Sequence, residues 1–188
     1  MTTLDDENFI VDPATVSPWP IAIRYGLIGG LIYCIYALVA NMSGLATGGL
    51  GMVASMISSL FVLMLSVALI VIPVKHHRDK ELGGFITIGR VIMIGVVVTA
   101  ISMLISIAFN YIYMNFIDPG YLDTAMASME EMMESLVPED QLEQAMIDSR
   151  ARLEPAAMAK TGLIMAVVVG LVVSSIVGLI MKKDPPRV

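Results

Sequence analysis

Residues 25–74 read YGLIGGLIYCIYALVANMSGLATGGLGMVASMISSLFVLMLSVALIVIPV and contain no charged side chain over fifty positions. Two more uncharged runs follow, at residues 91–117 and 161–181. About 20 apolar residues in a helix cross the hydrocarbon core of a bilayer. Because a soluble chain of 188 residues cannot bury so much apolar surface, the sequence predicts an integral membrane protein.

The fifty-residue run is too long for a single span. As one helix it would extend about 75 Å, whereas the hydrocarbon core is about 30 Å thick. Four glycines between residues 41 and 51 supply a break. We therefore expect an all-α membrane protein with a four-helix transmembrane domain over residues 19–183. The predicted spans are residues 21–42, 50–74, 86–113 and 156–181, between an acidic disordered tail at 1–18 and a C-terminal tail at 184–188.

The composition supports a membrane protein and limits the kinds of partner that it can bind. Hydrophobic residues make up 57% of the chain and charged residues 15%, with a mean hydropathy of +0.82. The lipid bilayer is therefore an expected partner. The net charge of −6 argues against nucleic acid, because phosphates require a basic surface.

The basic residues predict the orientation of the spans, because cytoplasmic loops carry an excess of Lys and Arg. Eight basic residues fall on the side that the two termini share, and three fall on the other. We therefore expect both termini in the cytoplasm and residues 118–154 outside. The eight are Arg24, Lys75, Arg78, Lys80, Arg90, Lys182, Lys183 and Arg187, and the three are Arg150, Arg152 and Lys160.

Residues 118–154 carry ten acids and two arginines, so they cannot be buried in lipid. Their periodicity predicts two amphipathic helices, the second over residues 138–153. The first helix carries an apolar face, here called the methionine stripe: Leu122, Met126, Met129, Met133 and Leu136. The sequence is compatible with burial of this stripe against any of four surfaces: the ends of the spans, the second helix, the membrane surface, or a partner. The acidic charge disfavours the membrane surface, because surface-lying helices are usually basic.

Two groups of residues resemble metal ligands. Met126, Met129, Met132 and Met133 offer thioethers that suit Cu(I), but methionine also fills apolar faces, and the chain has 16 of them. His76, His77, Asp79 and Glu81 include zinc-ligand types. Adjacent histidines point apart on a helix, and the chain has no third histidine. We therefore interpret residues 75–81 as a solvated basic loop and predict no metal or cofactor.

Mid-span positions carry no Asp, Glu, Lys or His, which argues against a proton-coupled transporter. They also lack the nucleophile and base pairs, or the metal motif, of an intramembrane protease. We therefore predict that the protein is not an enzyme.

Small residues recur every four positions in the last predicted span, which favours close packing of helix backbones. This small-residue ridge consists of Ala166, Gly170, Ser174 and Gly178. Gly26 and Gly30 repeat the spacing in the first span. The spacing does not indicate whether the facing helix belongs to the same chain.

Three short sequences resemble a known family. They are RDKELGGFITIGR at residues 78–90, FNYIYMNFIDPGY at 109–121 and GLIMKK at 178–183. They are similar to small bacterial four-span membrane proteins catalogued as domain of unknown function 4199, over most of residues 20–183. The resemblance implies an inner-membrane location, cytoplasmic termini and no assigned activity. The motif positions are Lys80, Glu81, Gly84, Asn110, Tyr113, Asp118, Pro119 and Tyr121.

Together these features favour a structural or accessory subunit that associates with itself or with a larger membrane complex. The alternative is a small oligomeric channel or transporter, with Asn110 and the acidic segment shaping a cation route.

Overall fold

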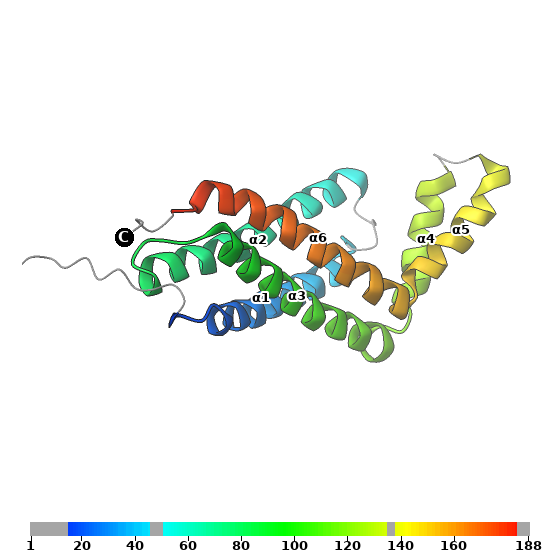
Figure 1. The fold of residues 1–188 in the computed structure, drawn as a ribbon. Helices are drawn as coiled ribbons and strands as arrows, with labels where there is room; N and C mark the ends of the chain where they lie inside the picture. The colour runs from blue at the N-terminus through cyan, green and yellow to red at the C-terminus, as the bar shows by residue number, and fades with distance from the viewer. Residues whose placement is uncertain (1–14, 46–50, 135–137, 184–188) are drawn as a thin grey trace, which may run out of the picture.

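The computed structural model describes residues 15–45, 51–134 and 138–183 of the chain (Figure 1). All its regular elements within these residues are helical. They are α1 (Trp19–Met42), α2 (Gly51–His76), the π-helical turn η2 (His77–Glu81), α3 (Ile88–Ile112), the π-helical turn η3 (Tyr113–Ile117), α4 (Tyr121–Glu134), α5 (Glu139–Leu153) and α6 (Pro155–Met181).

Four helical segments in the described residues are long and apolar enough to cross a membrane. They are Trp19–Met42, Val53–Glu81, Ile88–Ile117 and Pro155–Met181. The prediction of an all-α chain with four spans is therefore confirmed. The second helical segment continues to Glu81, past the predicted limit at residue 74. The predicted tails at 1–14 and 184–188 lie outside the described residues. At the end of the predicted N-terminal tail, Val16 packs against the core.

The third span is the centre of the bundle. Its helix α3 makes the most extensive contacts with α1 and α6, while α2 joins mainly through its C-terminal half. The fully buried side chains of this core include Ile70 of α2 and Val91, Ile94 and Val98 of α3. Large apolar side chains on the outer surfaces of all four spans are exposed, as in helices that face lipid.

The small-residue ridge of α6 faces α3 of the same chain. A Cβ added to Gly95 of α3 would lie 2.5 Å from the Cβ of Ser174, so glycine is required where these two backbones approach. Gly170 faces Thr99 and Val96 in the same way. The remaining ridge contacts place Gly178 against Ile88 and leave Ala166 half-buried beside a cavity.

The first span packs against the opposite side of α3 by the same means. A Cβ on Gly26 would lie 2.8 Å from the Cβ of Ile101. Gly30, one turn further along α1, faces Ile105. Ser102 of α3 donates a hydrogen bond of 3.0 Å to the carbonyl of Gly26 and joins the two backbones directly.

Helices α4 and α5 lie side by side and project from the end of the bundle (Figure 1). We call this pair the acidic hairpin. Met126 faces α5 across a groove of about 520 Å³ that Leu142 and Met146 also line. The other described members of the methionine stripe, Leu122, Met129 and Met133, are half-buried, and Leu136 lies outside the described residues.

Replacing Gly95 by alanine should test the close approach of α3 and α6. The added methyl group overlaps Ser174, and overpacking of this kind costs about 1–3 kcal/mol. We expect a lower unfolding temperature in detergent micelles. Gly89→Ala is the matched control on the same helix, because its added Cβ meets nothing within 4 Å. Equal unfolding temperatures for the two variants would contradict the close approach.

Candidate functional site

Residues 75–81, predicted as a solvated loop, are helical. Lys75 and His76 complete α2, and residues 77–81 form η2, which the N–H of Leu82 closes by bonding the carbonyl of His77 at 3.1 Å. The prediction is wrong because Ile70, Val74 and His77 recur at steps of four and three on one helix face, and all three are fully buried. His76 points away and is exposed, as expected for adjacent histidines.

His77 is the centre of a buried polar network. Its Nδ1 lies 2.7 Å from Oε2 of Glu81, and its Nε2 lies 3.2 Å from Nη1 of Arg90. A guanidinium group can only donate, so Nε2 accepts from Arg90 and the N–H of Nδ1 donates to the Glu81 carboxylate. The imidazole in this arrangement is neutral. Arg90 also donates to the carbonyl of Val16 at 2.7 Å, so the network joins η2, α3 and the segment before α1.

At this end of the bundle, residues 178–183, the last of the three family-like sequences, contact residues 78–90, the first of them. Ile86 and Lys183 form an antiparallel bridge with N···O distances of 3.0 and 3.1 Å. Gly84, at φ 92°, lies in the left-handed region that glycine adopts most readily, and with Gly83 it turns the chain back toward α3. Of the other motif residues, Glu81 belongs to the His77 network and Lys80 is exposed.

The remaining motif residues lie at the opposite end of α3. Tyr113 is buried and begins η3, and the N–H of Asp118 bonds its carbonyl at 2.8 Å. The rings of Tyr113 and Tyr121 meet edge to face at 5.8 Å. Burial raises the pKa of Tyr121 above its usual value, and Tyr113 and the Asp118 carboxylate add to the shift. The phenol of Tyr121 therefore stays protonated where α4 begins.

The motif residues thus form two joints and not one site. Asn110 donates its amide to the carbonyl of Ser106 at 2.8 Å within its own helix, and Pro119 lies exposed in the turn before α4. Both joints are π-helical turns that begin with a buried ring and end a span. Such turns are frequent at functional positions. Here η2 connects α2 to the start of α3, and η3 connects the end of α3 to α4.

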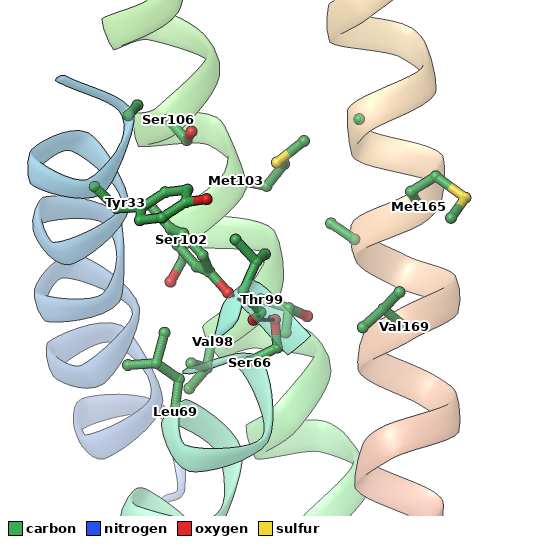
Figure 2. A pocket seen from close by; sticks show the side chains of 15 residues that line it. Tyr33, Ser66, Leu69, Val98, Thr99, Ser102, Met103, Ser106, Met165 and Val169 are labelled. Carbon is green, nitrogen blue, oxygen red and sulfur yellow. Dashed lines mark hydrogen bonds between the residues drawn. The ribbon is translucent and has the colours of Figure 1, made fainter. Parts of the chain in front are cut away.

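A cavity of about 320 Å³ lies among the four spans, and no pattern in the sequence indicated it. Figure 2 shows Tyr33 of α1 on one side, Met165 and Val169 of α6 on the other, and α3 between them. The Tyr33 hydroxyl lies 2.7 Å from the Ser66 hydroxyl of α2. The fifteen lining side chains, all among the described residues, carry no charge. The cavity therefore suits neutral and mainly apolar groups.

Neither group of candidate metal ligands forms a site in the structure. Within the described residues, no three His, Cys, Asp or Glu side chains are placed to hold a metal ion. Met132 is 47% exposed, whereas Met126, Met129 and Met133 are half-buried on another face of α4. The four thioethers therefore do not converge.

Truncating His77 should destabilise the fold far more than truncating its neighbour. His77→Ala opens a cavity and removes the partner of Glu81 and Arg90, at a cost of about 2–4 kcal/mol. His76→Ala removes an exposed ring and should change stability by less than about 0.5 kcal/mol. Thermal unfolding in detergent measures both, and similar losses would show that the network does not stabilise this end of the bundle.

The comparison with known proteins returned a family and no individual relative. No curated protein and no solved structure matches the chain. The model of the family described as Protein of unknown function (DUF4199) matches residues 24–183, which is most of the chain, and the protein therefore belongs to that family.

Proposed function

We propose that this protein is a non-catalytic accessory subunit of a larger membrane complex, located in the bacterial inner membrane with both termini in the cytoplasm. Two features support an accessory role. The ridges of α1 and α6 that favour helix association are already packed against α3, so a partner has to use another surface. The acidic hairpin provides one.

The exposed charge of the acidic hairpin is the observation that carries the proposal. Its carboxylates point to solvent wherever their side chains are described. In the described residues both ion pairs lie at η2, so none involves α4 or α5. The ring contact of Tyr121 and the joint between α5 and α6 attach the hairpin to the spans. This surface fits a partner with a basic face.

The same charge disfavours a second copy of the chain as the occupant. Residues 118–154 carry ten acids and two arginines, so two hairpins placed face to face would repel each other. We therefore infer a different protein as partner. This choice refines the expectation that the chain associates either with itself or with a complex.

A non-catalytic role is supported by how the polar groups of the spans are used. Thr99 donates to the carbonyl of Gly95 at 2.9 Å, and Ser102 donates to that of Gly26. Ser174 donates to the carbonyl of Gly170. These hydroxyls stabilise helices and helix pairs.

The central cavity favours transport of a neutral solute as a second candidate function, and its uncharged lining disfavours a cation route.

Cysteine labelling in intact cells tests the proposed orientation. In a Cys34→Ser background, Glu131→Cys should react with a membrane-impermeant maleimide, whereas Lys80→Cys should react only after the cells are opened. Both positions are exposed, so burial does not explain a difference between them. Reaction at Lys80→Cys alone in intact cells would reverse the orientation.

Charge reversal on α4 tests the proposed docking surface. Glu130→Lys, Glu131→Lys and Glu134→Lys together replace three exposed carboxylates. Because a basic partner would then be repelled, we expect the complex extracted from native membranes in mild detergent to be lost on a native gel. The matched control replaces the same residues by aspartate, which keeps the charge, and should retain the complex.

Two results would overturn the docking proposal. One is a wild-type chain that migrates as a monomer under these conditions. The other is a complex that survives charge reversal. A monomer that also moves a neutral solute across liposomes would favour the transport role.

A further inference from the structure

The end of the bundle opposite the acidic hairpin brings together basic residues from separate parts of the chain. Arg78 of η2 donates to the carbonyl of Met181 at 3.4 Å, and Ile86 is bridged to Lys183. These contacts place the end of α6 beside the end of α2 (Figure 1). We call four exposed lysines at this location the basic end: Lys75, Lys80, Lys182 and Lys183.

The carboxylates nearest the basic end are already engaged. Asp79 pairs with Arg78 at 2.7 Å, and Glu81 pairs with His77 at 2.7 Å. Among the described residues, none of the four lysines forms an ion pair. Lys183 Nζ lies 5.3 Å from the centre of the Phe85 ring, a cation–π contact that leaves its charge uncompensated. The Asp79 charge also acts on Lys75 and Lys80, but within the described residues no direct ion pair neutralises any of the four lysines.

Exposed apolar side chains adjoin this charge on the same two helices. Ile180 is 79% exposed and Leu179 is 65% exposed, directly before Lys182. Ile72 of α2 is 51% exposed, one turn before Lys75. A ligand that satisfies both surfaces must combine an anionic head with long apolar chains.

We propose that the basic end binds an anionic diacyl phospholipid. The headgroup phosphate contacts the lysines, and the acyl chains lie along Ile72, Leu179 and Ile180. Clusters of basic residues at the membrane edge of a helix attract anionic headgroups. A free phosphate would leave the apolar surface unused, and a nucleic acid would be repelled by the net charge of −6. This site is independent of the acidic hairpin and of the proposed partner.

The test is a lipid titration of the purified full chain in non-ionic detergent, with the unfolding temperature as readout. Palmitoyl-oleoyl phosphatidylglycerol should raise this temperature, and the phosphatidylcholine with the same acyl chains should raise it much less. Glycerol 3-phosphate at the same concentration should have no effect. Equal shifts with the two lipids, or the full shift with glycerol 3-phosphate, would overturn the proposal.

Matched variants separate a local site from a general effect of charge. Lys75→Gln, Lys80→Gln and Lys182→Gln together remove three ammonium groups and leave the Lys183 contact with Phe85 in place. The apparent affinity for phosphatidylglycerol should fall roughly 100-fold, since each basic group contributes a factor of about five. Arg150→Gln, Arg152→Gln and Lys160→Gln remove the same charge from the opposite end and should leave the affinity unchanged.

Two further variants keep the test decisive if the triple glutamine variant does not fold. Arginine at the same three lysine positions keeps the charge and should retain the affinity. Lys182→Gln alone should lower it about five-fold. An affinity unaffected by Lys182→Gln, or lowered equally by the control triple variant, would show that the basic end is not the site.

Discussion

The close approach of α3 to its two neighbours is the constraint on which the rest of the structure depends. In lipid there is no hydrophobic force between helices, so packing relies on van der Waals contact and small side chains. Gly95 opposite Ser174 and Gly26 opposite Ile101 let the backbones meet, and Ser102 adds a hydrogen bond between helices. Because α3 is held on both sides, its two ends become fixed points for the segments before and after it.

Each end of α3 meets a π-helical turn with a buried ring. His77 begins η2, which precedes α3, and Tyr113 begins η3, which follows it. The two joints differ in chemistry: one is a polar network around a neutral imidazole, and the other is an edge-to-face contact between aromatic rings. They separate two surfaces of opposite charge, the basic end and the acidic hairpin. The lipid and partner interactions proposed above therefore use opposite ends of one bundle.

Much of this fold could be predicted from the sequence, because crossing a bilayer imposes constraints that act locally. Every backbone polar group inside lipid has to be satisfied within its own segment, so uncharged runs of sufficient length become helices. Helix α6 begins at Pro155 and α5 follows Pro138, each within one residue of the start that the sequence predicts. The spacing by four in α6 indicated the face that packs, since small residues in register are recognisable without knowing their partner.

The sequence by itself therefore determined the number of the spans, the helical class and the uneven distribution of charge. Only the tertiary structure decided what each face meets. Residues 75–81 look like a solvated loop until Arg90, thirteen positions after His77, supplies a hydrogen bond that makes burial of that imidazole favourable. The ridge partner, the central cavity and the meeting of Lys183 with Ile86 likewise depend on segments far apart in the chain. Local periodicity carries no information about such contacts. It shows which face of a helix is apolar or lined by small residues, but not which segment packs against that face.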